Sequence, residues 1–436
     1  MSTTNPPDYA PSWALQLPSP SYTPSPQTHE LRLALNGWLR PNVTSCEFVK
    51  QTKNGCASVR LSGQDGRASL PVYGQGTSIQ GIVDVYKNEG IVSIEVQIDG
   101  ILKLEQVAGA GTCAYNLCSC KNILWIKDRV HDVPCPRSLP FSLVLPTTFS
   151  TGDKTYPLPP SYEAHLSGLP GFRAFVSYTL TVVVVKPNDV PNIVKSALLR
   201  KDDWVIFTPF LYHPRSCPLQ PVPPPLLTNP QYGFIASPQW KASVSIVPAN
   251  HGGQDVTVEL YLPSTRIFCV RQTIPFHLSF RSSPDALALF MPLVPGVGSS
   301  LPKRQFTRIQ LMRQTTVDVR NAVVLGTKTD IWRVDCIGEG AFKHTGSGSD
   351  WLAYSGEIFM ASHITVGGFR AGGFSVRDYL VLTVNPPDLV ESSFKEMRMV
   401  VPIQLVTDQW VEDESGLMVH GGMRGVSSSS DERVSK

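Results

Sequence analysis

A long alternation of apolar and polar residues constrains the fold of this chain more than any other feature. The apolar set is Phe172, Ala174, Val176, Tyr178, Leu180, Val182 and Val184, and the residues between them are mostly polar. A period of two is typical of a β-strand with one buried and one solvated face. At about 3.3 Å per residue such a strand spans roughly 45 Å, beyond the usual length of about three to ten residues. It favours an elongated or bent sheet, and therefore a scaffold rather than an enclosed pocket.

The same alternation recurs along most of the chain, most clearly in Gly90–Asp99, where Val92, Ile94, Val96 and Ile98 share one face. Further strands are predicted at Leu31–Leu39, Thr77–Tyr86, Ile123–Val130, Leu139–Leu145, Ala242–Val247, Val256–Leu262, Arg266–Phe280, Thr307–Arg320, Ile331–Ile337, Gly356–Val366, Phe374–Val384 and Met399–Val406. No ten-residue amphipathic helix with caps stands out, so an all-β fold is predicted over an α/β fold.

Composition divides the chain into two folded parts with tails. Its 436 residues, 42% of them hydrophobic, are enough to bury two sizeable cores. The predicted division is a Pro/Ser-rich disordered tail at 1–29, a first domain at 30–186, a Pro-rich connection at 187–238, a second domain at 239–410 and a disordered tail at 411–436. The connection is placed by the run from Pro214 to Pro230, because proline lacks the backbone donor that a helix or central strand needs.

Charge and targeting signals exclude several classes of function. A net charge of +3, from 38 basic and 35 acidic residues, predicts no nucleic-acid partner. The N-terminal sequence has no secretory signal, and the longest apolar run, Val182–Val185, is far too short to cross a bilayer. Nine scattered cysteines make a poor disulfide framework. We therefore expect a cytoplasmic protein with no transmembrane segment.

The tail at 1–29 carries the sharpest functional motif. Pro6, Pro7 and Tyr9 fit PPxY, which WW domains bind as a polyproline II turn with a separate pocket for the tyrosine ring. Affinity per site is expected between about −4 and −8 kcal/mol, the millimolar and micromolar limits, so engagement gains from multivalency. A Pro-rich tail also produces this motif by chance.

A second PPxY match consists of Pro159, Pro160 and Tyr162. It precedes the long strand, and the alternative to a second WW site is a packed loop leading into that strand. Tyr22 follows Ser19-Pro20-Ser21, a near match that lacks the first proline and is not counted.

Other motifs point away from catalysis and metal binding. Cys113, Cys118, Cys120 and Cys135 lack a C-x-x-C pair to seed a zinc site, so neither metal nor cofactor is predicted. Gly338-Glu-Gly340 resembles part of a kinase glycine-rich loop but has no accompanying lysine, HRD or DFG element. Arg215, Pro218 and Pro221 form an SH3-type window that any Pro-rich linker offers. The chain is predicted not to be an enzyme. The alternative is a catalytic site assembled from loops, which would show as a deep polar pocket between the domains.

The tail at 411–436 contains four serines upstream of Asp431 and Glu432. Ser427, Ser428, Ser429 and Ser430 are candidate phosphorylation sites, since acidophilic kinases favour this arrangement. Each phosphate would add roughly 1.5 to 2 negative charges. An unmodified, solvated tail is the alternative.

Two sets of segments resemble the α-arrestin family. SLPFSLVLP, LPPSYE and GFRAFVSYTLTVVVVK are similar to its N-terminal domain, and IFCVRQTIPFHLSF, RIQLMRQTTVDVR, FSVRDYLVLTVNPP and VVPIQLVTDQW are similar to a fungal arrestin C-terminal domain. The resemblance covers roughly residues 30 to 410, and it rests on the order of the matches rather than on one diagnostic motif. It implies two immunoglobulin-like β-sandwich domains in tandem.

The resemblance also implies a function. An α-arrestin is an adaptor that links a membrane cargo, such as a plasma-membrane transporter or receptor, to a WW-domain HECT ubiquitin ligase for ubiquitination and endocytosis. Recruitment to the plasma membrane or endosomes would follow, with Pro6, Pro7 and Tyr9 binding the ligase. Members usually carry PPxY motifs in a C-terminal tail, whereas this one is N-terminal. Phosphate sensing of the β-arrestin kind is not implied, because the first strand offers Arg32 in place of adjacent lysines. The alternative function is a ligase-independent sorting or signalling scaffold that binds partners through a sheet edge.

Overall fold

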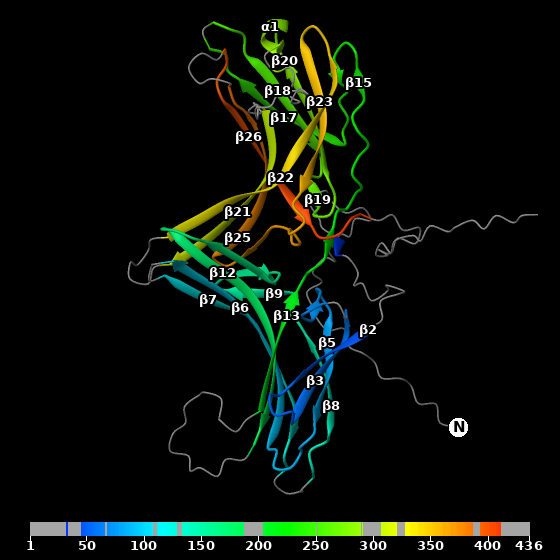
Figure 1. Ribbon diagram of the computed structural model, residues 1–436, viewed down its shortest axis with the longest axis vertical. Coiled ribbons are helices and arrows are strands. Elements are labelled where there is room, and N and C mark those ends of the chain that lie inside the picture. Colours follow the sequence, from blue (N-terminus) through cyan, green and yellow to red (C-terminus); the bar gives the residue numbers. More distant parts are fainter. Residues whose placement is uncertain are drawn as a thin grey trace, which may run out of the picture.

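The protein has an all-β, β-sandwich-like fold with large curled sheets (Figure 1). The computed structural model describes residues 32–33, 45–65, 68–107, 111–128, 133–186, 204–250, 252–288, 290, 307–320, 328–386 and 393–410. Within these residues the helical content is α1 (Pro284–Ala288), a single short turn of helix. The predicted tails at 1–29 and 411–436 lie outside the described residues, and the predicted domain boundaries stay predictions.

The first half of the chain, residues 45–212, forms two sheets that enclose one core. The six-stranded sheet contains β4 (Val72–Tyr73), β13 (Trp204–Tyr212), β12 (Gly171–Val185), β6 (Ser93–Val107) and β7 (Thr112–Ile126) in that order, with β11 (Tyr162–Leu166) added to β12. The four-stranded sheet is β2 (Ser45–Gln51), β3 (Ala57–Asp65), β5 (Ser78–Val85) and β8 (Ser138–Val144), and β9 (Thr148–Thr151) pairs with β10 (Lys154–Pro157) beside them. The alternation at 172–184 is thus a strand, β12, with its apolar set buried.

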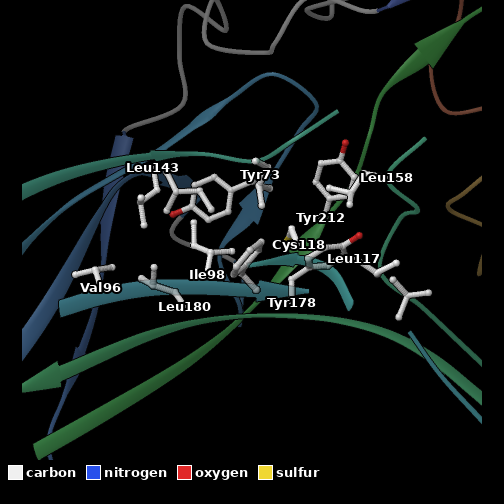
Figure 2. Packing of buried hydrophobic residues seen from close by; sticks show 14 of the residues in the cluster. Tyr73, Val96, Ile98, Leu117, Cys118, Leu143, Leu158, Tyr178, Leu180 and Tyr212 are labelled. Carbon is white, nitrogen blue, oxygen red and sulfur yellow. The ribbon is translucent and has the colours of Figure 1, made fainter. Parts of the chain in front are cut away.

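Tyrosines fill the centre of this core (Figure 2). Tyr178 stands on β12 among Val96 and Ile98 of β6 and donates its hydroxyl to the carbonyl of Pro159 at 2.7 Å. Gly100 on β6 makes room for the ring, because a Cβ there would lie 2.6 Å from Tyr178 Cε1. Burial raises the pKa of Tyr178 above its ordinary value, so the hydroxyl stays a hydrogen-bond donor.

The second half, residues 240–410, is one curled ten-stranded sheet around a second core. Its strands in order are β17 (Trp240–Val247), β18 (Val256–Pro263), β20 (Ile274–Arg281), β23 (Trp351–Met360), β22 (Lys328–Ser347), β21 (Thr307–Arg320), β25 (Phe374–Val384), β26 (Met397–Val406) and β19 (Ile267–Cys269), with β24 (Phe369–Ala371) on β25. Two small pairs complete the fold, β1 (Arg32–Leu33) with β14 (Ser216–Cys217) and β15 (Thr228–Asn229) with β16 (Gly233–Phe234).

The core of the first half is completed by the second half. Buried side chains at the ends of β21, β22, β24 and β25 join the same apolar cluster as those of β6, β7 and β12; they are Val317, Val319, Ile331, Ala371, Phe374 and Val376. Contact is close, since a Cβ at Gly111 would lie 2.6 Å from Val319 Cγ1. The two halves therefore share apolar interior instead of meeting only through a linker.

The Pro-rich connection is fixed to the outer face of the second sheet by His277 on β20. The backbone N–H of Leu226 donates to His277 Nε2 at 3.0 Å, so the ring carries its proton on Nδ1, which donates to Ser355 Oγ at 2.7 Å. Trp240 and Phe234 lie against the imidazole with ring centroids at 4.5 and 4.8 Å. Burial lowers the pKa of His277 to about 4, because the site has no room for the hydrated cation.

Several predicted strands need correction. The strand predicted at Ile123–Val130 is the end of β7, which begins at Thr112, and Arg266–Phe280 is two strands, β19 and β20, separated by a turn. Gly356–Val366 is displaced, since β23 ends at Met360. Trp204–Tyr212 is a strand inside the range predicted as connection; as the edge of its sheet over most of its length it tolerates Pro209. Of Leu31–Leu39, only Arg32–Leu33 is described.

The shared core predicts one cooperative unfolding transition. Phe374→Ala should lower the free energy of unfolding by about 3–5 kcal/mol, because Phe374 is 1% exposed and sits where the halves meet. Phe359→Ala, at an exposed position of the same sheet, is the matched control and should cost about 0.5 kcal/mol or less. Denaturant unfolding followed by near-UV and far-UV circular dichroism measures both. Two separate transitions, of which Phe374→Ala shifts one, would contradict the prediction.

His277 predicts loss of stability on mild acidification. Its pKa is lower in the folded chain than the ordinary 6.5, so the unfolded chain binds more protons between pH 6.5 and about 4. Stability should be complete above pH 6.5 and fall by about 3 kcal/mol as the pH drops to about 4. Urea unfolding at several pH values, with His277→Gln as the non-titrating control, isolates this contribution. A wild-type curve parallel to that of the variant would show that His277 is not responsible.

Candidate functional site

The predicted site residues fall into two groups. Pro6, Pro7, Tyr9 and Ser427 to Ser430 lie outside the described residues, so their roles stay predictions. Pro159, Pro160 and Tyr162 are described, and they lead from β10 into β11 at the junction of the two halves.

The segment from Pro159 to Tyr162 is packed into the fold. Both prolines are buried, and the carbonyl of Pro159 accepts the Tyr178 hydroxyl. Ser161 pairs with Tyr212 of β13, donating its N–H to the Tyr212 carbonyl at 2.8 Å and accepting the Tyr212 N–H on its Oγ at 2.9 Å. A WW groove needs the exposed face of both prolines. This geometry agrees with the packed-loop alternative for the second PPxY match.

Tyr162 carries the contact from the first half to the second. Its ring meets Phe369 edge-on with centroids 5.3 Å apart and lies 6.0 Å from Phe374. Its side chain and that of Arg313 on β21 line the same surface at the junction. Tyr162, which the second PPxY match makes a candidate WW-domain ligand, thus packs between the two halves of this protein.

Arg313 and Asp378 form a buried ion pair at the same junction. Arg313 Nε and Nη2 donate to the two carboxylate oxygens of Asp378 at 2.8 and 3.0 Å, and Nη2 also donates to the Val366 carbonyl at 2.9 Å. Their side chains are 4% and 1% exposed. Burial acts to lower the pKa of Arg313, but the hydrogen bonds and charge of Asp378 outweigh it and hold that pKa above its ordinary value.

A pocket of about 560 Å³ lies over this ion pair, between β11 of the first half and β21 and β22 of the second. Its walls include Tyr162, Arg313, Arg333, Asp335 and His363. The two arginines are already neutralised, Arg313 by Asp378 and Arg333 by Asp335 at 2.7 Å. Paired charges of this kind can hydrogen-bond a polar molecule. Glu163 also lines the pocket and adds a carboxylate that belongs to neither pair.

The thiol in the pocket wall is engaged with neutral groups. Cys336 Sγ lies 3.3 Å from the Gly338 carbonyl and 3.5 Å from the Gln310 amide. An activated cysteine needs a base or a positive group beside its sulfur, and neither of these partners supplies one. The Cys336 thiol in this wall is therefore held by hydrogen bonds to neutral groups.

The remaining sequence motifs have structural explanations. Within the described residues no group of three His, Cys, Asp or Glu side chains could hold a metal, and burial raises the pKa of Cys118 to about 12. Gly340 allows close packing of β22, since a Cβ there would lie 2.3 Å from Ile309 Cγ2. Arg215 pairs with Asp408 and Pro218 is buried, so the SH3-type window is held against the end of β26.

The buried ion pair at the junction was not among the site residues predicted from the sequence. On β21, Arg313 lies on the same face of the strand as the buried residues Ile309, Leu311 and Val317. On β25, Asp378 lies on the same face as the buried residues Val376 and Leu380. Opposite charges on the apolar faces of two neighbouring strands are the sequence signal that indicates a buried pair.

Comparison with known protein families finds none that matches this chain, and comparison with curated proteins likewise finds no match. In the described residues no helix is long and apolar enough to cross a membrane.

Breaking the buried ion pair should be costly. Arg313→Ala leaves the Asp378 carboxylate buried without its counter-charge, and should lower the free energy of unfolding by about 3–5 kcal/mol. The double variant Arg313→Met/Asp378→Leu removes both charges and should recover most of that loss. Denaturant unfolding of the three proteins measures the difference. Equal destabilisation by the single and double variants would show that the packing of the Arg313 chain, and not the charge left behind, sets the cost.

Proposed function

We propose that this protein is a non-enzymatic adaptor of the α-arrestin kind, which links a membrane cargo to a WW-domain HECT ubiquitin ligase. The resemblance of its segments to that family and the all-β fold support the proposal. The observation that carries it is the contrast between the two PPxY motifs. Pro159 and Pro160 are buried within the fold, which leaves Pro6, Pro7 and Tyr9 as the motif to recruit the ligase.

The physical role of such an adaptor is to raise an effective concentration. One surface of the folded body would hold the cargo and the PPxY segment would hold the ligase, so that ubiquitin transfer becomes nearly intramolecular. A body whose halves share a core suits this role, because the distance between its contacts changes little.

The test is a titration of the full chain against WW domains of HECT ligases. Tyr9→Ala should weaken binding at least about tenfold, since the ring fills one of the two WW pockets. Tyr22→Ala, in the same segment but lacking the first proline, is the matched control and should bind like wild type. Tyr162→Ala should lower stability without changing WW affinity at a temperature where it is folded.

If the wild-type chain bound no WW domain at about millimolar concentration, direct recruitment of the ligase would be ruled out. The alternative function, a scaffold that binds partners through a sheet edge, would then lead. It has one specific support: β7 is a long edge strand, from Thr112 to Ile126, that pairs within its sheet only with β6 in the described residues.

A further inference from the structure

The end of the first half that points away from the second half is built from four strand connections. Their described parts are residues 52–56, 86–92, 127–128 with 133–137, and 186, and they are called here the free end. Backbone hydrogen bonds hold these connections together: the N–H of Tyr86 donates to the carbonyl of Cys56, and the N–H of Val92 donates to the carbonyl of Val185. The opposite ends of the same strands reach the second half at Gly111. The free end is thus one extremity of the long axis, at the bottom of Figure 1.

Large apolar side chains are exposed on the free end and on the last residue of β7 beside it. Tyr86 is 57% exposed, Ile126 59%, Val133 57% and Val92 38%. They come from separate connections, yet the hydrogen bond from Lys127 N–H to the Val92 carbonyl places two of these connections side by side. Neighbouring exposed apolar groups at an extremity of a molecule indicate a contact surface.

The charge of the free end is positive. Its described residues include five basic side chains, Lys53, Lys87, Lys127, Arg137 and Lys186, against the acidic Glu89 and Asp128. This local excess of three equals the net charge of the whole chain, so the remainder is balanced. Apolar side chains mixed with lysines are the chemistry that binds anionic membrane surfaces, because the apolar groups enter the headgroup layer while the ammonium groups face the lipid charges.

We propose that the free end is a membrane-contact site that seats on an anionic lipid bilayer. Tyr86, Ile126 and Val133 enter the interface, and Lys53 and Lys87 lie against the headgroups. The long axis then stands away from the membrane, with the second half farthest from it. This goes beyond the proposed ligase recruitment and does not depend on it, because the test contains no ligase.

The experiment is co-sedimentation of the full chain with phosphatidylcholine vesicles, with and without about one third phosphatidylserine, at about 0.1 M salt. Wild type should bind the phosphatidylserine vesicles and leave them at high salt. Lys53→Glu/Lys87→Glu should weaken binding at least about tenfold, and Ile126→Ser/Val133→Ser should weaken it severalfold. Because all four positions are exposed, the variants should melt like wild type.

Matched controls lie on the second half. Lys395→Glu/Arg398→Glu makes the same charge change at exposed positions before and within β26, and Val244→Ser/Val400→Ser makes the same apolar change. Both should bind vesicles like wild type. Absence of wild-type binding, or equal loss in the controls, would overturn the proposal. So would free-end variants that keep their vesicle binding but convert a dimer to a monomer in light scattering, since the surface would then be a contact between copies.

Discussion

The shared apolar core at the junction is the constraint on which the rest of the structure depends. Six buried side chains of the second half complete the core of the first, so separating the halves would expose them to water. At about 1.5–3 kcal/mol for each large apolar side chain, that exposure costs on the order of 10 kcal/mol. The lengths of the strands follow. β22 spans 20 residues and about 65 Å because one of its ends lines the second core and the other reaches the first.

The buried ion pair follows from the same arrangement. Strands that continue from one core to another pass a region where neither core fills the space completely, and there Arg313 and Asp378 lie opposite each other on β21 and β25. A buried pair adds little net stability compared with apolar residues of the same volume. Any strand register that separates the two charges is, however, unfavourable, because each charge would then be buried without its partner. A slip of β25 against β21 by one residue would turn Asp378 to the other face. We therefore expect the pair to fix the register of the strands that join the halves. Tyr162 of the first half lies beside it, in the same lining as Arg313.

Two strands of the second half have the predicted bounds, Thr307–Arg320 and Phe374–Val384. Buried residues alternate with partly exposed ones along the first, and the second departs from alternation only where Leu380, Val381 and Leu382 are all buried. The second half of β22, residues 338–347, was not predicted as a strand, because Gly338, Gly340 and Gly346 lower strand propensity. Close packing nevertheless requires these residues to be small. β2 and β3 were missed because polar residues stand at many of their positions. The junction could not be found from alternation alone, because it depends on which strands of the two halves meet.

Ser216 and Cys217 are the place where the first and last described segments of the chain meet the body. β1 pairs with β14 at Ser216 and Cys217, and the N–H of Asp408 donates to the Ser216 carbonyl at 2.9 Å. Arg32 and Asp408, although far apart in sequence, thus both lie beside Ser216 and Cys217. From Arg32 the chain can carry Tyr9 at most about 80 Å, even fully extended. A WW domain that bound the proposed motif would be confined to a volume centred on the place where β1 pairs with β14. Under the proposed function, this attachment would keep the ligase near the junction of the two halves, from which a cargo held by either half could be reached.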